Sequence, residues 1–500
     1  MARTGLDRRT GRGHQRSCRK GIPQLRHWRV TGLLGLILIA AFASPAATAP
    51  AAKPAAAALP PGLDPFANPD PFPSTYRPLP SEPTAIINAD ILTPDGPEIA
   101  RGVIVMSAGK ILAVGAGAAV PADARVIDAH GRTVTPGIID PHSHLGVYAS
   151  PGVQAMSDGN EATDPDTAEV WAEHSVWPQD PGFAHALAGG VTTLEILPGS
   201  ANLFGGRSVI LKNVAATTVQ GMKFPGAPYD LKMACGENPK RVYGDKGRFP
   251  STEMGNVAGY RAAWIRARDY QRKWDDYRAK AAKGEKADPP TRDLQLDTLA
   301  GVLRGEIRIQ NHCYRADEMA QMIDISHEFG FHIAAFHHAS ESYKIADLLK
   351  REGICSVTWA EWSGFKMESF DGIEENAAML QRAGACVTLS SDDANLIQHL
   401  NLEAALAMAA GNRAGLAITR PEAIGWITLA PAKALGIDTK TGSITPGKMA
   451  DLVIWSADPF SVYALADQVF IDGALAYDAR DPRYQPRSDF MLGQPAGASR

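Results

Sequence analysis

The sequence VTPGIIDPHSHLG, residues 134–146, decides the fold class of this chain. Its first half is an apolar run typical of a buried strand, and its second half carries two histidines one residue apart. Because alternate residues of a strand share a face, His142 and His144 are expected to point the same way and to chelate one ion. Metal ligands at the end of a strand are typical of an α/β barrel, whose active site lies at the carboxyl ends of its strands.

Seven further apolar runs follow this one, with longer helical stretches between them. The runs are GVTTLEIL (190–197), RSVILKN (207–213), DLKMAC (230–235), EIRIQNHC (306–313), FHIAAFHH (331–338), ICSVTW (354–359) and ACVTLSSD (385–392). Strands that alternate with helices over about 250 residues predict a parallel α/β fold, and eight runs suit an eightfold (β/α)8 TIM-like barrel. We assign this barrel to residues 134–435.

The sequence segments on both sides of the predicted barrel are typical of β-strands. Strand patterns broken by turns fill residues 84–131, and two more, GKMADLVIW (447–455) and DQVFIDGALAYD (467–478), follow the barrel. Their alternating, β-branched character predicts an antiparallel layer. We therefore expect a small composite β-sandwich domain built from residues 84–133 and 436–480, with a C-terminal tail at 481–500.

The first 83 residues are expected to precede these domains. Residues 30–43, VTGLLGLILIAAFA, follow a basic stretch and precede the small-residue run SPAATA, a pattern typical of an export signal. We assign residues 1–49 to a signal peptide, or alternatively to an uncleaved N-terminal anchor, and residues 50–83 to a Pro/Ala-rich linker. The expected location is periplasmic or secreted, with membrane anchoring by the N-terminal segment as the alternative.

The charge of the chain limits its partners. The net charge is -4 over 500 residues, but residues 1–49 hold nine Lys/Arg and one Asp, so the remainder has 41 Lys/Arg against 53 Asp/Glu. An acidic body repels phosphate backbones, and we expect no nucleic-acid partner. The expected partner is a small-molecule or short-peptide substrate; the sequence leaves homo-oligomer formation open.

Four cysteines lie in or beside strand-like runs of the predicted barrel: Cys235, Cys313, Cys355 and Cys386. We interpret them as buried thiols, because free cysteine behaves as a small apolar residue. Export would permit disulfides, so the sequence leaves their pairing open.

Further metal-binding residue types close the later runs. His312 is near the end of the fifth run, His338 ends the sixth and Asp392 ends the last. Imidazole and carboxylate are ligands that Zn²⁺ prefers. Together with the first-strand pair, these residues predict a divalent metal site, most simply for zinc, at one end of the barrel.

The motifs taken together resemble a known family. The segments TPGIIDPHSHLG, GGVTTLEILPGSANLFGG, NHCYRADEM, FHHASESYKIAD, LSSDDAN and TLAPAKALGIDTKTGSITPGKMADLVIWSADPF are similar to the amidohydrolase superfamily, and within it to imidazolonepropionase-like and prolidase-like exported members. The resemblance spans roughly residues 84–480. It implies a metal-dependent hydrolase on a distorted eightfold barrel with a flanking β-sandwich.

The resemblance also implies roles for single residues. The implied metal ligands are His142, His144, His312, His338 and Asp392. Lys232, in the apparent fourth strand, would be carboxylated and bridge two metal ions. Alternatively Lys232 is an ordinary lysine, one ion is held by the first-strand pair, His312 and Asp392, and His338 polarises the substrate. Glu195 is a weaker candidate for the bridge.

The expected chemistry follows from these ligands. A divalent ion lowers the pKa of bound water from 15.7 to about 7, and Asp392 is the expected proton acceptor and later donor. The predicted reaction is hydrolysis of a C–N bond in an amide, a cyclic amide or a peptide. A deaminase on the same site, or a catalytically silent binding protein of the same fold, are the alternatives. Substrate contacts are expected from loops after the strands, at Glu237, Tyr314, Arg315 and Tyr343; for Arg315 a surface salt bridge is the alternative.

Overall fold

The computed structural model describes residues 59–485, which form seventeen strands and ten α-helices. The predicted signal peptide, residues 1–49, and all but the first residues of the predicted tail lie outside this range. None of the described helices is long and apolar enough to cross a membrane.

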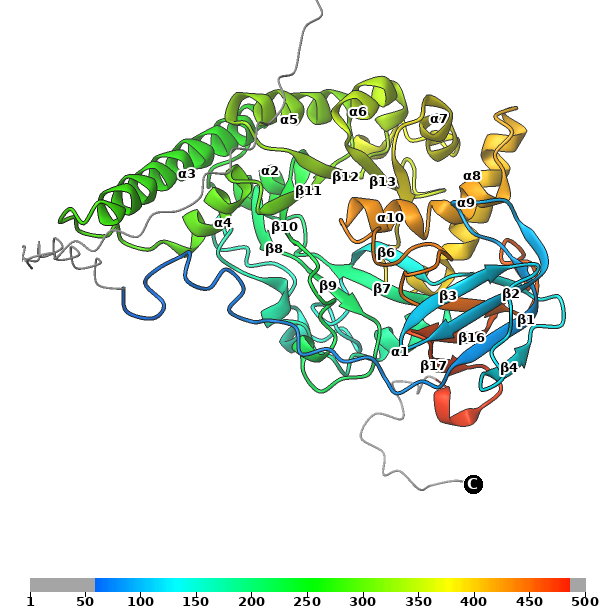
Figure 1. Ribbon diagram of the computed structural model, residues 1–500. Coiled ribbons are helices and arrows are strands. Elements are labelled where there is room, and N and C mark those ends of the chain that lie inside the picture. The colour runs from blue at the N-terminus through cyan, green and yellow to red at the C-terminus, as the bar shows by residue number, and fades with distance from the viewer. Residues whose placement is uncertain (1–58, 486–500) are drawn as a thin grey trace, which may run out of the picture. The chain divides into compact units, whose positions relative to one another are not determined.

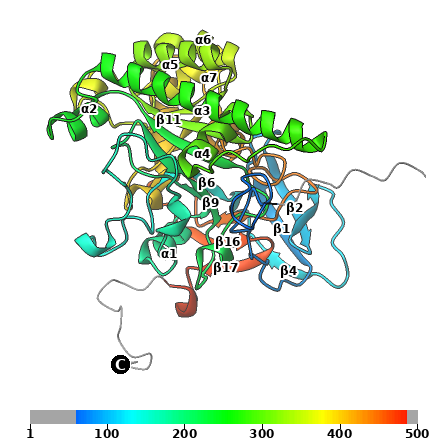
Figure 2. The same cartoon turned by 90° about the vertical axis from the view of Figure 1, so that its left-hand side faces the viewer.

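An eight-stranded sheet joins the two ends of the described chain. Its strands are β1 (Thr84–Ile91), β2 (Ile99–Ser107), β3 (Lys110–Gly115), β4 (Arg125–Asp128), β5 (Thr133–Pro136), β15 (Leu452–Trp455), β16 (Ala466–Ile471) and β17 (Ala474–Asp478). The order is β17-β16-β15-β5-β1-β2-β3, with β4 paired to β1, and the junction is the antiparallel pair of β15 and β5, where Val453 faces Thr135. In Figure 2 these strands, blue and red, lie beside one another. Strands of the two predicted flanks thus share one sheet, where two packed sheets were expected.

The strands of the central region lie in two further sheets. One has the order β14-β13-β12-β11-β10-β8 and the other β6-β7-β9. Their bounds are β6 (Ile138–Ser143), β7 (Val191–Ile196), β8 (Phe204–Arg207), β9 (Val209–Lys212), β10 (Tyr229–Ala234), β11 (Ile307–Cys313), β12 (Ile333–His338), β13 (Cys355–Thr358) and β14 (Val387–Leu389). Each of the eight predicted runs contains one of these strands, and β10 to β14 are parallel.

The prediction of eight parallel strands was wrong for the run 207–213. This region forms β8 and β9, which pair antiparallel with β10 and β7. The chain returns from the end of β7 at Ile196 through a short loop without a helix. The segment that joins β7 to its partner β9 contains β8 and no helix, whereas parallel neighbours are usually joined by a helical crossover, so β9 returns antiparallel to β7.

Ten α-helices connect these strands. They are α1 (Pro181–Ala188), α2 (Glu237–Gly244), α3 (Glu253–Ala282), α4 (Leu294–Leu303), α5 (Ala316–Phe329), α6 (Ala346–Glu352), α7 (Asn376–Ala383), α8 (Leu400–Arg413), α9 (Arg420–Gly425) and α10 (Leu429–Ala434). Figure 1 shows α5, α6 and α7 along β11, β12 and β13. Local sequence fixes several ends: Thr252 caps α3 through the Gly255 N–H, and α5 ends at Gly330 with φ +68°.

The main core lies between these strands and helices. It contains side chains from both sheets of the central region and from the helices, including Leu231 of β10, Trp264 of α3 and Phe336 of β12. A second core, with Ile104 and Leu452, belongs to the eight-stranded sheet. Helix α3 buries four aromatic side chains, Tyr260, Trp264, Tyr270 and Trp274, and leaves most of its charged residues to solvent.

The interpretation of the four cysteines as free thiols was wrong. Cys235 pairs with Cys313, with Cα atoms 5.3 Å apart, and Cys355 pairs with Cys386, with Cα atoms 4.5 Å apart. Each bridge links two neighbouring strand ends, where parallel pairing already holds the backbones at the separation a disulfide needs. Apolar runs predict burial of a cysteine but give no indication of which strand becomes its neighbour.

Residues 59–83 form a strap without helix or strand. Ser74 Oγ donates to Lys223 O at 2.6 Å, the Thr75 N–H donates to Gln220 O at 2.9 Å, and the Tyr76 hydroxyl donates to Asp472 Oδ2 at 2.5 Å. This part of the predicted linker thus contacts both the central region and the eight-stranded sheet.

Candidate metal centre

The end of β6 supplies the first two imidazoles of the site. His142 Nδ1 lies 2.9 Å from His337 Nδ1, and His144 Nδ1 lies 2.8 Å from the carbonyl oxygen of Leu197. Both contacts occupy the Nδ1 side of the ring and leave Nε2 for the site. Hydrogen bonds of this kind fix the orientation and the tautomer of metal-ligating histidines.

Asp392 faces both of these imidazoles. Its Oδ1 lies 3.3 Å from His142 Nε2 and 3.2 Å from His144 Nε2. Its N–H donates to the carbonyl oxygen of His142 at 3.0 Å, so the residue after β14 is tied to the end of β6. Asp392 has φ +53° and His338 has φ +71°, a region that non-glycine residues rarely adopt and that often marks functional sites.

His312 and His338 complete the group from the ends of β11 and β12. Their ring centroids are 4.2 Å apart, and His338 Nδ1 lies 3.8 Å from Asp392 Oδ2. Both nitrogens of His312 and Nδ1 of His338 are buried without a hydrogen-bond partner among residues 59–485. We call His142, His144, His312, His338 and Asp392 the histidine centre.

The histidine centre fits a divalent metal ion. Ligand atoms of His142, His338 and Asp392 all lie within 4.8 Å of one another. Burial lowers the pKa of His142, His312 and His338 well below the usual value, so these rings are neutral and keep a lone pair for a metal. Buried nitrogens without partners cost free energy that an ion would recover.

Lys232 of β10 reaches the same place. Its Nζ lies 3.4 Å from His142 Nε2, its side chain is buried, and burial lowers its pKa to about 8. No carboxylate of residues 59–485 lies within salt-bridge distance of it. Glu195, the weaker bridge candidate, accepts from Ser208 Oγ at 2.5 Å, and burial raises its pKa well above the usual value; no contact ties it to the histidine centre.

Asp140 links the end of β6 to the segment that follows β14. Its Oδ2 accepts from Ser391 Oγ at 2.5 Å, and its Oδ1 accepts from the N–H groups of His142 and Ser391, each at 3.2 Å. Burial raises the pKa of Asp140 to about 7. Its role is to hold the residues that precede His144 and Asp392, and sequence reasoning missed it.

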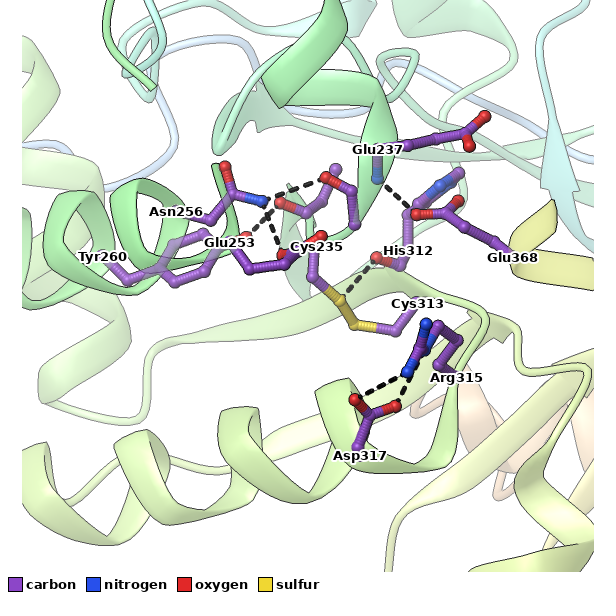
Figure 3. The surroundings of a disulfide bond; sticks show 12 residues. Cys235, Glu237, Glu253, Asn256, Tyr260, His312, Cys313, Arg315, Asp317 and Glu368 are labelled. Carbon is purple, nitrogen blue, oxygen red and sulfur yellow. Dashed lines mark hydrogen bonds and ion pairs between the residues drawn. A yellow bond between two sulfur atoms is a disulfide. The ribbon is translucent and has the colours of Figure 1, made fainter. Parts of the chain in front are cut away.

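Of the four residues expected to contact substrate, Tyr314 lies beside the histidine centre, and Arg315, Tyr343 and Glu237 contact other residues. Tyr314 stacks on His338, with ring centroids 4.8 Å apart and planes at 9°. Arg315 instead pairs with Asp317 at 3.0 Å on an exposed part of α5, which agrees with the surface salt-bridge alternative (Figure 3). Tyr343 donates to Asp371 O at 3.1 Å, away from the histidines, and Glu237 lies 3.6 Å from Lys366 Nζ.

The loop after β13 supplies aromatic side chains that sequence reasoning missed. Trp359 lies 4.5 Å from the His338 ring and 5.1 Å from Trp362, centroid to centroid, while Phe365 lies 6.2 Å from both Trp359 and Tyr314. We call Tyr314, Trp359, Trp362 and Phe365 the aromatic wall. The signal was present as the aromatic-rich segment WAEWSGF directly after the seventh predicted strand.

A second group of possible metal ligands lies near the Cys235–Cys313 bridge, and Figure 3 shows two of its members, Glu253 and Glu368. Side-chain oxygens of Glu253, Glu318 and Glu368 are within 4.8 Å of one another, and we call these residues the glutamate cluster. Burial, followed by the neighbouring carboxylates, raises the pKa of Glu318 to about 8.

Comparison with known proteins agrees with this fold. Residues 133–481 match the model of the amidohydrolase family. The amidohydrolase tasK of Hapsidospora irregularis is 34% identical over 397 residues, 76% of this chain but 39% of that protein, so the chain spans about two fifths of that relative. A 5-methylthioadenosine/S-adenosylhomocysteine deaminase of Symbiobacterium thermophilum is 25% identical over 72% of this chain and 81% of its own length.

Among solved structures, an amidohydrolase from Thermotoga maritima is similar with a TM-score of 0.72 and 34% identity, over 79% of this chain and 100% of that one. This similarity implies a TIM-barrel-like α/β fold for the central region. Because the family model matches most of the chain, this protein belongs to the amidohydrolase family.

Proposed function

We propose that this protein is a metal-dependent hydrolase of a C–N bond in an amide, a cyclic amide or a peptide. The observation that carries the proposal is the convergence of four imidazoles and Asp392 from the ends of four strands, with three buried ring nitrogens that lack a partner among residues 59–485. The names of the tasK relative and the T. maritima structure support the same class.

The histidine centre would hold the ion, with zinc as the simplest choice for imidazole and carboxylate donors. When bound, a divalent ion supplies Lewis acidity, which polarises a carbonyl group and acidifies water. The protein's own contribution is orientation, because the Nδ1 contacts of His142 and His144 fix their rings before any ion arrives.

Asp392 would move the proton of the reaction. Its two oxygens face different imidazoles, and its side chain is one-fifth exposed, so it borders both the ligands and the space for substrate. In this role its carboxylate accepts a proton from the attacking water and later donates it to the leaving nitrogen. The positive φ of Asp392 aims the side chain back over the end of β6.

Lys232 would determine whether the centre takes one or two ions. We propose that its Nζ is carboxylated, because the group is buried beside His142 and lacks the carboxylate partners that Lys212, an equally buried lysine, has in Asp451 and Asp472. A carbamate would place two anionic oxygens among the imidazoles. In the alternative, Lys232 stays an amine and the centre holds one ion.

The aromatic wall would bind the apolar part of the substrate. It rises from His338 through Tyr314 and Trp359 to Phe365, whose side chain is 56% exposed. An exposed phenyl ring beside buried ones offers a surface for an apolar acyl or side-chain group. N-acyl amino acids and dipeptides with a bulky apolar group are therefore the first substrates to try.

The test is metal content combined with a substrate screen. Purified wild-type protein should contain about two ions per chain and should hydrolyse one of a set of dipeptides, N-acyl amino acids and cyclic amides. Lys232→Met should lower the content to one ion or none. Lys212→Met is the matched control: it removes an equally buried lysine and should destabilise the fold while leaving the ion content of the folded fraction unchanged. One ion per wild-type chain would favour the mononuclear site.

A deaminase is the second candidate, favoured by the S. thermophilum relative. Release of ammonia from an aminated ring, without formation of a new carboxylate, would support it. A protein that binds no metal and hydrolyses nothing in the screen would instead be a silent binding protein of the same fold.

We also propose that the protein is exported and that the two central sheets are parts of one distorted eightfold barrel beside a composite β domain (84–133 and 436–480). The apolar segment 30–43 and two disulfides support export, since disulfides persist in oxidising compartments. The ties from Asp392 and Ser391 to β6 support closure of the barrel. Sequencing the N-terminus of the protein from cell fractions tests export.

A further inference from the structure

A cavity of about 240 Å³ lies under the strap, away from the histidine centre. Strap residues 65 and 68–71 form one wall, and Trp171, Arg207 and Tyr229 are among the side chains of the others. At about 30 Å³ for each water molecule, the volume corresponds to roughly eight waters. It is large enough for a small organic molecule.

Arg207 is the unusual group in this cavity. Its side chain is 8% exposed, and Nε donates to Thr298 Oγ1 at 2.9 Å. Its Cζ lies 4.2 Å from the centre of the Trp171 ring and 5.5 Å from that of Tyr229, so aromatic rings hold the guanidinium in place. Neither terminal nitrogen has a hydrogen-bond partner among residues 59–485, and both belong to a residue that lines the cavity.

The other charged groups of the cavity wall already have partners. Arg292 pairs with Asp297 at 2.7 Å and Arg304 with Glu306 at 2.7 Å. Asp70 accepts from the Tyr229 hydroxyl at 2.8 Å and pairs with Lys223 at 3.2 Å; Lys223 also pairs with the buried Glu173 at 3.0 Å. Within the described part of the chain, Arg207 is thus the one lining charge without an oppositely charged partner.

We propose that this cavity binds a small organic carboxylate, which the two terminal nitrogens of Arg207 grip side by side. The planar guanidinium presents parallel N–H donors at the spacing of carboxylate oxygens, the geometry of bidentate recognition. Burial lowers the pKa of Arg207 to about 10, even though nearby Tyr229, Asp297 and Glu173 favour its charged form. An anionic ligand offsets the cost of burying this charge.

The proposed site is separate from the histidine centre. In the antiparallel ladder, Arg207 of β8 pairs with Leu231 of β10, whereas Gly206 pairs with Lys232. Because successive residues of a strand point to opposite faces, Arg207 and Lys232 lie on opposite sides of the sheet. The contact of Arg207 with Thr298 of α4 places it on the helix-covered side. Binding here needs no metal and does not depend on the proposed function.

The experiment is calorimetric titration of sodium benzoate, sodium acetate and sodium phosphate into the full-length protein. Benzoate should bind one equivalent, and Arg207→Gln should weaken it at least tenfold. Arg304→Gln, at the same cavity but paired with Glu306, should change it less than threefold, and His142→Ala should leave it unchanged. No benzoate binding at millimolar concentration, equal binding by Arg207→Gln, loss of binding in His142→Ala, or preference for phosphate would each overturn the proposal.

Because Arg207 is buried, a second measurement uses the unaltered protein. Hydrogen exchange with and without benzoate should show protection of residues 168–174, 204–209 and 227–231, which surround the cavity. Protection confined to the ends of β6, β11 and β12 would place benzoate at the histidine centre and would contradict the proposal.

Discussion

The histidine centre and the glutamate cluster each bring at least three side chains of metal-binding types within reach of one another. The glutamate cluster is already neutralised. Glu253 pairs with Lys240 at 2.5 Å, Glu368 pairs with Lys366 at 2.9 Å and accepts from the Glu237 N–H, and Glu318 keeps a proton through its raised pKa. In the histidine centre, burial lowers the pKa of His142, His312 and His338, so these three rings are neutral and keep unused lone pairs.

The contrast between compensated glutamates and unpartnered imidazoles shows that residue type alone does not make a metal site. Carboxylates crowd together when cations and a shared proton compensate them, and such a cluster is a structural feature. Buried imidazole nitrogens without partners have no compensation inside the protein, which points to a ligand from outside. The following variants test this contrast.

The largest effect is expected for Asp392→Asn. Removal of the proton-accepting group should lower kcat on the best substrate of the screen by about 10²- to 10⁴-fold, the usual contribution of a general acid–base, while the ion stays bound to the imidazoles. Glu318→Gln is the matched control in the glutamate cluster and should keep kcat within about twofold at pH 5. Full turnover by Asp392→Asn would refute the proton-transfer role.

Removal of metal should act through the histidine centre alone. Chelation should abolish turnover, and return of zinc at 100-fold above its dissociation constant should stabilise the fold by about 2.7 kcal/mol. The increase in thermal midpoint should vanish in His142→Ala and persist in Glu368→Gln. The contrast fails if the glutamate variant loses the increase.

The protonated state of Glu318 predicts a specific pH dependence of stability. Its pKa is raised to about 8, so the folded protein holds a proton that the unfolded chain loses near its ordinary pKa of 4.5. The stabilisation is complete below that ordinary pKa and is lost as the pH rises towards 8. Between pH 5 and 8 the chelator-treated wild type should lose about 1–3 kcal/mol more unfolding free energy than Glu318→Gln. Urea unfolding at both pH values measures this, and parallel curves would contradict the assignment of the proton.

The smallest effect is expected at the rim of the aromatic wall. Phe365→Ala should raise KM for an apolar substrate about fivefold, equivalent to roughly 1 kcal/mol of lost apolar contact, with kcat and metal content unchanged. Phe370→Ala, an exposed phenylalanine with no aromatic contact to the wall, is the control and should have no effect. An equal change in both variants would remove the wall from the substrate site.

Much of this arrangement could be predicted from the sequence, because hydrophobic periodicity and strand-end histidines are local signals. Each of the eight runs overlaps a strand of the central region, and the structure brings His142, His144, His312, His338, Asp392 and Lys232 together. The direction of β8 and β9 could not be predicted, since it depends on the route of the chain between strands. The disulfide partners and the pairing of Arg315 with Asp317 depend likewise on neighbours that only the fold defines.

The junction of β5 with β15 has a consequence for the order in which the protein assembles. Thr135 of β5 lies directly before β6, the strand that carries His142, and its partner Val453 is synthesised long after it. Buried Lys212 likewise lacks its ion-pair partners until Asp451 and Asp472 have been synthesised. A nascent or partly translocated chain therefore exposes an open sheet edge and an unpaired charge until its C-terminal segment arrives. Productive folding is expected only once β15 to β17 have been synthesised, and loss of these strands should leave an aggregation-prone chain.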